Sequence, residues 1–113
     1  PVVQFMCREA LVPYLVERAQ LAEREARLLV TREEGDEVEE VLARPGQAAV
    51  IDRTLRHLRV IDPAVGSGAF PLGMLGEIVR LRRLCHLAQA DGREPGPDTI
   101  RDWKLHAIER SLF

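Results

Sequence analysis

The chain has 113 residues and a net charge of −2, with 46% of its residues hydrophobic and 30% charged. This length suits one domain with a hydrophobic core, and the composition argues against disorder. No apolar run approaches the roughly 20 residues of a membrane-spanning helix, so we expect no membrane association. The net charge gives no overall electrostatic case for nucleic-acid binding. The lack of a signal peptide and of paired cysteines predicts a cytoplasmic protein.

Residues 2–30 are predicted to be helical, because apolar residues recur there at spacings of three and four. Pro13 lies inside this pattern and is expected to kink or restart the helix. The acidic stretch TREEGDEVEE follows and is broken by Gly35. Asp36, with a glutamate three residues later, indicates the start of another helix. The grouped carboxylates lack the alternating spacing of a calcium loop, so we interpret them as a solvated helix end.

Pro45 and Gly46 mark a turn, and residues 47–58 are predicted to form a further short helix. Leu58–Ile61 is the one convincing strand pattern, and we place the strand at about residues 59–62. A helix over 70–90, a loop over 91–98 and a last helix capped by Asp98 complete the chain. Because one strand cannot satisfy its own backbone groups, further strands are expected to follow Phe113.

The stretch LRVIDPAVGSGAFPLG, residues 58–73, carries the clearest functional signal. Asp62 would place a carboxylate at the carboxyl end of the strand, where open α/β folds bind ligands. Gly66 and Gly68 have no side chains, so the backbone can bend sharply and a ligand can lie against it. The helix that starts near Ala69 would offer unpaired N–H groups to a negatively charged group.

Two phosphate-binding motifs are excluded by individual residues. A P-loop needs a lysine directly after its second glycine, and no lysine follows Gly68. The dinucleotide fingerprint Gly-x-Gly-x-x-Gly needs a glycine where this chain has Pro71. The turn therefore suits a ligand with a carboxylate and an adenosine better than a pyrophosphate.

The string VIDPAVGSGAF resembles motif I, the first S-adenosylmethionine-binding motif of the N6-adenine-specific DNA methyltransferases. The likeness is strongest to the methylase subunits of type II restriction-modification and BREX-like phage-defence systems. PVVQFMCREALVPYL at the N-terminus resembles motif X, a helix that helps cover the cofactor, and WKLHAIERSLF is similar to the segment before the second strand of these enzymes. The resemblance implies an α/β fold, that of a class I, Rossmann-like methyltransferase, of which this chain would be the N-terminal portion. Its parts would be the motif X helix at about 1–15, a helical connection over 16–57, the motif I strand, turn and helix over 58–90, a loop over 91–98 and a helix over 99–113.

The resemblance also implies a site and an activity. Val2, Val3 and Phe5 would lie near the cofactor through motif X, and the longer parent enzyme would methylate adenine N6 in DNA. The family's Asn/Asp/Ser-Pro-Pro-aromatic tetrad, which stacks a flipped adenine, does not occur in the 113 residues. We therefore assign no catalytic residue and no metal, and we expect the chain to be inactive by itself. The residues implied to bind S-adenosylmethionine are Asp62, Pro63, Ala64, Gly66, Ser67, Gly68 and Phe70.

Two other hypotheses remain open. The chain could be a helical interaction or scaffold fragment, in which Asp62 merely caps a helix, or part of a methyltransferase that acts on RNA or protein. Self-association is expected through exposed apolar helix faces or the unpaired strand. The other notable residues receive structural interpretations: a solvated helix face for Arg80, Arg82 and Arg83, a core position for Trp103, and close approach of a helix to a sheet for Gly73 and Gly76.

Overall fold

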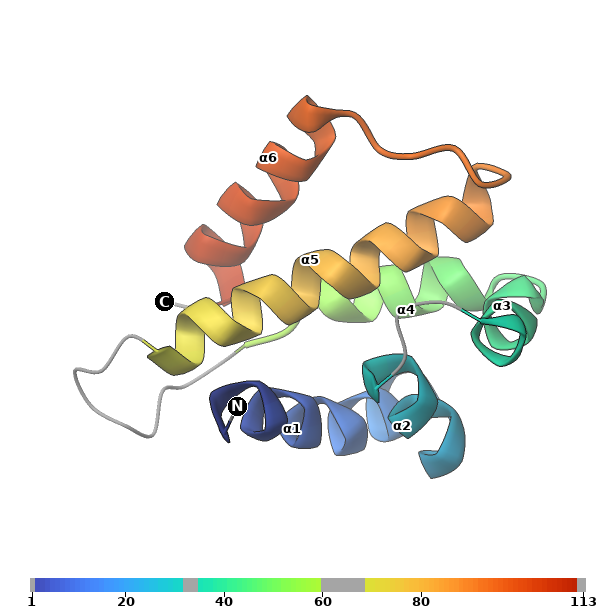
Figure 1. Cartoon of the computed structure of the whole chain (residues 1–113), viewed down its shortest axis with the longest axis horizontal. Helices are drawn as coiled ribbons and strands as arrows, with labels where there is room; N and C mark the ends of the chain where they lie inside the picture. The colour runs from blue at the N-terminus through green and yellow to red at the C-terminus, as the bar shows by residue number, and fades with distance from the viewer. Residues whose placement is uncertain (1, 32–34, 60–68, 112–113) are drawn as a thin grey trace.

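The computed structural model describes residues 2–31, 35–59 and 69–111, which form α-helices and one π-helical turn (Figure 1). Within these ranges there is no strand, and no helix has the length and apolar character needed to cross a membrane. The elements are α1 (Val2–Arg18), α2 (Glu23–Thr31), α3 (Asp36–Ala43), α4 (Gln47–Arg56), α5 (Ala69–Gln89), α6 (Pro97–His106) and the π-helical turn η1 (Ala107–Ser111).

The predicted α/β fold is wrong, because the described residues form a domain of helices packed on helices. Leu58, expected to begin the strand, instead lies in the turn that follows α4: its N–H donates to the carbonyl of Leu55 at 3.3 Å and its side chain is buried. Arg59 has no regular structure, and the rest of the predicted strand lies outside the described residues. The apolar faces of the helices cover one another, so this core needs no sheet.

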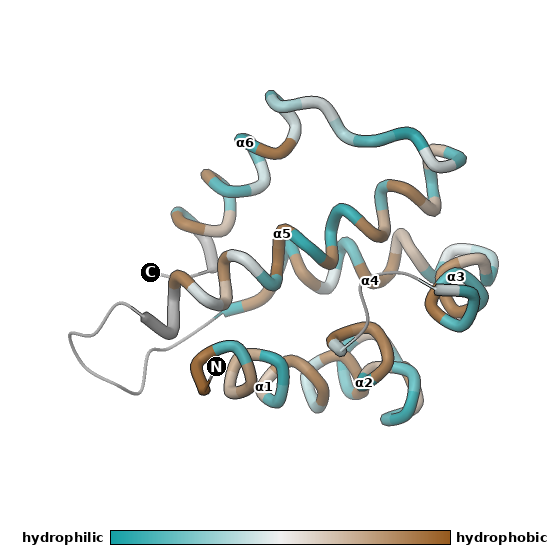
Figure 2. The backbone as a smooth tube through the Cα atoms, in the orientation of Figure 1, coloured by the Kyte–Doolittle hydropathy of each residue, from teal (hydrophilic) through white to brown (hydrophobic). Residues whose placement is uncertain are grey.

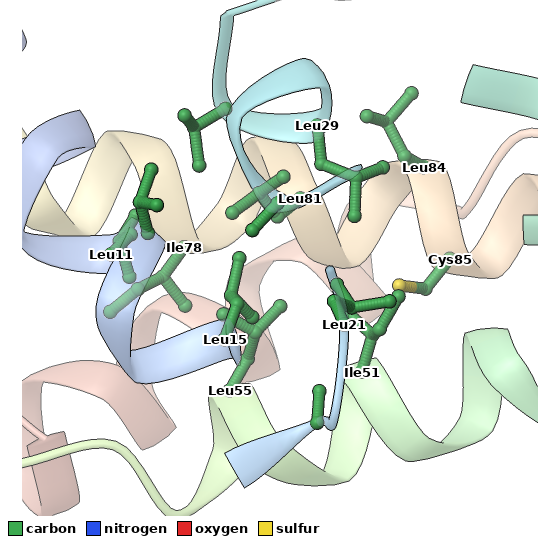
Figure 3. Close-up of a cluster of buried hydrophobic side chains, with 14 of the residues drawn as sticks. Leu11, Leu15, Leu21, Leu29, Ile51, Leu55, Ile78, Leu81, Leu84 and Cys85 are labelled. Carbon is green, nitrogen blue, oxygen red and sulfur yellow. The ribbon is translucent and has the colours of Figure 1, made fainter. Parts of the chain in front are cut away.

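The core lies where α1, α2, α4 and α5 meet, and their largest side chains point toward one another (Figure 3). Full burial of a leucine or isoleucine contributes about 1.5–3 kcal/mol relative to exposure, so this cluster is the main source of stability. The long helix α5 contacts each of the other three. The largest side chains of these helices with less than 2% exposure are Leu11, Leu15, Leu29, Ile51, Leu55, Ile78 and Leu81.

The first predicted helix is in fact two helices, and the break does not fall at Pro13. α1 runs through Pro13, which is exposed, so water can replace the backbone hydrogen bond that a proline lacks. The chain turns instead at residues 19–22, where Gln20 has a φ of 57°. α2 then begins with the N–H of Ala22 bonded to the Glu25 side chain at 3.2 Å, one half of a capping box.

The remaining helices follow the prediction closely. α3 begins at Asp36, and Gly46 supplies the left-handed turn, with a φ of 75°, before α4. Asp98 is not the cap of the last helix, since Gly96 holds that position and Asp98 pairs with Arg101 at 3.2 Å inside the first turn. α6 packs on α5 through Trp103, which is buried.

Candidate functional site

Most of the predicted cofactor-binding segment lies outside the described residues. This applies to Asp62, Pro63, Ala64, Gly66, Ser67 and Gly68. The segment ends where predicted, because α5 begins at Ala69 and Phe70 is its second residue. The described part of the site is therefore the neighbourhood of the first turns of α5.

α1 lies alongside the first half of α5 (Figure 1). The helices approach closely at Gly73, where a Cβ atom would lie 2.9 Å from Cγ1 of Val3 and 3.1 Å from Sγ of Cys7. One turn later, a Cβ at Gly76 would meet nothing within 4 Å. Our interpretation of both glycines was wrong: Gly73 admits another helix rather than a sheet, and Gly76 faces open space.

A buried carboxylate holds the same two helices together. The Glu77 side chain is 6% exposed, and its Oε1 accepts hydrogen bonds from Nε of Arg8 at 3.1 Å and from Nε and Nη2 of Arg80 at 3.3 Å. Nε2 of Gln4 donates to Oε2 at 3.5 Å. Two guanidinium groups thus compensate the buried charge. We call the packing of residues 3–8 against Gly73 and Glu77 the α1–α5 seam.

Arg80 extends this network to a third helix. Its Nη2 also donates to the carbonyls of Leu29 and Val30, both at 3.1 Å, in the last turn of α2. The last carbonyls of a helix generally lack partners within the helix, so a cation there satisfies them and complements the helix dipole. The interpretation of Arg80 as part of a solvated face was wrong.

Arg82 also lies in the interior. Its side chain is 8% exposed, its Nε donates to Oδ1 of Asp52 at 2.9 Å, and its guanidinium carbon lies 4.9 Å from the centre of the Trp103 ring. His86 packs against the same ring in a T-shaped arrangement, with the two ring centroids 5.9 Å apart. Trp103 is thus a core residue, as predicted, while Arg82 is not the solvated residue we expected. Arg83 stays near the surface and pairs with Glu94 at 2.8 Å.

Neither cysteine is suited to nucleophilic chemistry. Burial raises the pKa of the Cys7 thiol, and the negative charge of Glu77 raises it further. Burial, reinforced by Asp52, raises the pKa of Cys85 to about 12. Both thiols therefore stay protonated at neutral pH. In the described ranges no group of three or more His, Cys, Asp or Glu side chains is placed to hold a metal ion.

The starts of α1 and α5 expose apolar side chains beside the seam. Val2 is 73% exposed, Phe5 64% and Leu72 70%, and Met6 is exposed as well. The hydrophobic beginning of α1 is visible in Figure 2. We call these four residues the apolar end. Of the residues that the motif X resemblance places near the cofactor, Val2 and Phe5 are exposed here and Val3 packs into the seam.

Sequence reasoning missed Glu77, although the pattern contained a signal. Glu77 lies three residues after Met74 and four before Leu81, on the face of α5 that carries the buried apolar residues. A carboxylate at such a position must find cationic partners, and the helix facing it offers Arg8.

The chain matches no protein-family model, and no curated protein or solved structure matches it either. The functional assignment therefore rests on the motif I-like string and on the geometry around the start of α5.

Proposed function

We propose that the chain is the S-adenosylmethionine-binding part of a cytoplasmic DNA adenine-N6 methyltransferase of a restriction-modification or phage-defence system. The segment from Asp62 to Phe70 binds the methionine portion of the cofactor, and the apolar end, at the starts of α1 and α5, covers its adenosine. A longer enzyme supplies the adenine-binding tetrad that these 113 residues lack, and DNA is the partner of that enzyme. To this chain we assign the binding of the cofactor but not the transfer of the methyl group.

The observation that carries the proposal is the α1–α5 seam. The segments that resemble motif X and motif I are far apart in sequence, yet Arg8 and Glu77, 69 residues apart, bond directly. The close approach at Gly73 holds the start of α1 against the first turns of α5, which the motif I-like string enters. The starts of α1 and α5 lie on the same side of the molecule (Figure 1), and Phe5, in the first turn of α1, is exposed.

The chemistry of this end suits the methyl donor. The first N–H groups of a helix have no partner within the helix and favour a negative group, such as the carboxylate of methionine. Asp62 adds a carboxylate for the ammonium group, and Phe5 and Leu72 offer apolar surface to the adenine ring. The proposal needs only the segment from Asp62 to Phe70 and the helices α1 and α5, and it involves no sheet among the described residues.

Calorimetric titration of the chain with S-adenosylmethionine tests this proposal. We expect saturable one-to-one binding, a loss of at least about tenfold in affinity for Asp62→Ala, which is one lost charge-assisted hydrogen bond, and no binding by Gly68→Val. Asp102→Ala, which removes an exposed carboxylate from α6, is the matched control and should bind normally. Absence of binding at millimolar cofactor, or equal weakening by the control, contradicts the proposal.

The substrate of the longer enzyme is tested separately by the coding sequence after Phe113. An Asn-Pro-Pro-Tyr-type tetrad there supports adenine in DNA. Its absence removes the assignment to adenine and leaves methylation of RNA or protein as the alternative.

A second candidate function is that of a helical interaction module, which the exposed apolar end favours. Apolar patches of this kind on small domains often mark protein contacts. If this is the role, sedimentation velocity will show concentration-dependent association that Phe5→Ser with Leu72→Ser abolishes, and S-adenosylmethionine will not bind. Cofactor binding by a monomer excludes it.

A further inference from the structure

Five basic residues line one pocket where the end of α4 meets the end of α6. The pocket has a volume of about 310 Å³. Among the residues that the structure describes, its lining consists of Arg53, Arg56, His57, Arg59 and His106, none of which is acidic. We call it the basic pocket. The last turn of α4 and the segment that follows it supply four of the five side chains.

A simpler explanation would be that the arginines cap the carbonyl end of α4, but the histidines already do this. Nδ1 of His57 donates to the carbonyl of Arg53 at 2.8 Å, and Nε2 of His106 donates to the carbonyl of Arg56 at 2.9 Å. The ring nitrogens must carry these protons, because a carbonyl can only accept. The final carbonyls are therefore satisfied without the guanidinium groups.

The three arginines of the basic pocket differ from most others in the chain. Arg53, Arg56 and Arg59 are exposed, and none of them forms a hydrogen bond or ion pair with its side chain among the described residues. Acidic residues outnumber basic ones by 18 to 16, so the chain has carboxylates enough to pair them. By contrast, eight arginines in the described part of the chain have carboxylate partners: Arg8, Arg24, Arg27, Arg44, Arg80, Arg82, Arg83 and Arg101.

Three like charges in one pocket, with no partner among the residues that the structure describes, favour an anionic ligand. Guanidinium groups present paired N–H donors that match two oxygens of a phosphate, and they stay charged at all physiological pH values. All three arginines open to solvent, so a long polyanion can reach them together, whereas small ligands are generally enclosed by their sites. We propose that the basic pocket binds the phosphodiester backbone of a nucleic acid. This inference is independent of cofactor binding by the motif I-like segment.

The proposal fixes the salt dependence of binding. Each phosphate neutralised on duplex DNA contributes a slope of about −0.9 to the logarithm of affinity against the logarithm of salt concentration. Three arginines give a slope of about −2.7, which is a loss of roughly 40-fold between 50 and 200 mM KCl. Each arginine removed should reduce the slope by about one.

Fluorescence anisotropy with a labelled 20-base-pair duplex and the same strand unpaired tests the site on the whole chain. We expect binding at 50 mM KCl with the slope above, and a loss of tenfold or more for Arg53→Gln/Arg56→Gln/Arg59→Gln. The matched control is Arg24→Gln/Arg93→Gln/Arg101→Gln, which changes the net charge equally at exposed positions outside the pocket. Thermal melts followed by circular dichroism confirm that both variants fold.

Titration with inorganic phosphate alone distinguishes a site for free phosphate from a site for the phosphates of a nucleic acid. Oligonucleotide binding that depends on the pocket arginines supports the proposal, whether or not free phosphate competes. Binding of inorganic phosphate without any oligonucleotide binding overturns it, as does equal weakening by the pocket variant and the control. Absence of all binding at 50 mM KCl overturns it too.

Discussion

The α1–α5 seam and the basic pocket use the same side chain in opposite ways. In the seam, Arg8 and Arg80 point inward and share the buried carboxylate of Glu77. In the basic pocket, Arg53, Arg56 and Arg59 point to solvent, and histidines take the backbone acceptors beside them.

The difference indicates which arginines hold the fold and which can bind a ligand. A buried guanidinium that already has a carboxylate and backbone carbonyls has no donors to spare, and removing its partner leaves an uncompensated charge. An exposed guanidinium without a partner contributes little to folding and keeps its donors for an external anion. Stability measurements should therefore separate the two regions before any ligand is added.

The largest effect is expected from Glu77→Ala, which leaves Arg8 and Arg80 without their carboxylate. Breaking a buried pair costs about 3 kcal/mol, so the urea midpoint should fall markedly. The control is Glu37→Ala, which removes an exposed partner of Arg24 (3.5 Å) and should change the free energy of unfolding by less than about 0.5 kcal/mol. Equal losses of unfolding free energy in the two variants would show that the seam stabilises the fold no more than a surface ion pair does.

Gly73→Val should have the next largest effect, because it forces a side chain between α5 and α1. Over-packing of this kind costs about 1–3 kcal/mol. Gly76→Ala, one turn away in open space, should instead stabilise the chain by up to about 1 kcal/mol through helix propensity. Thermal unfolding of both variants measures the contrast, and a stable Gly73→Val variant would mean that the helices are not in contact there.

Glu25→Gln tests the ion pair between Arg44 and Glu25, which lies nearer the surface than the pairs of Glu77. Hydrogen bonds from Arg44 and from the N–H of Ala22 lower the pKa of Glu25 below its ordinary value of 4.5. The stabilising effect of the carboxylate is thus complete above pH 4.5 and is lost as the pH falls through the lowered pKa of the folded state. Wild type should be the more stable protein at pH 7, and the two should converge at low pH. A constant difference across this range would contradict the assigned cause.

The smallest effect is expected from the triple substitution Arg53→Gln/Arg56→Gln/Arg59→Gln. These side chains have no partner in the described part of the chain, and the histidines keep the end of α4 satisfied. The free energy of unfolding should change by no more than about 1 kcal/mol, the size of a helix-dipole contribution. A loss comparable to that of Glu77→Ala would make the basic pocket structural.

The helices could be predicted from sequence because each carries its own local signal. The apolar spacing of α1 and α5, the acidic start of α3 and the Pro45–Gly46 turn are independent of the rest of the fold. The break near Gln20 was missed because Pro13, the stronger local signal, is tolerated on the exposed face of α1. Whether the helix breaks at Pro13 or near Gln20 depends on the tertiary position of these residues, which the local sequence does not reveal.

The predicted sheet shows where local reasoning failed. A short apolar run does not specify a strand, and Leu58 satisfies its backbone in the turn after α4 while its side chain joins the helical core. The burial of Arg80 and Arg82 depends on partners in α2 and α4 that no local pattern identifies. The arginines at three-residue intervals in RTLRHLR were a visible signal for the basic pocket, hidden by a net charge near zero. The cofactor-binding role of Asp62–Gly68 stays a prediction.

Amide chemical shifts during titration with S-adenosylmethionine test the central claim most directly. We expect the largest shifts at Gly66, Ser67, Gly68 and Phe70, smaller ones at Val3 across the seam, and none at Arg53 or Arg56, because the cofactor carries no phosphate. Unchanged spectra at saturating cofactor, or shifts confined to the basic pocket, would contradict the claim that the start of α1 and the segment before α5 hold the methyl donor.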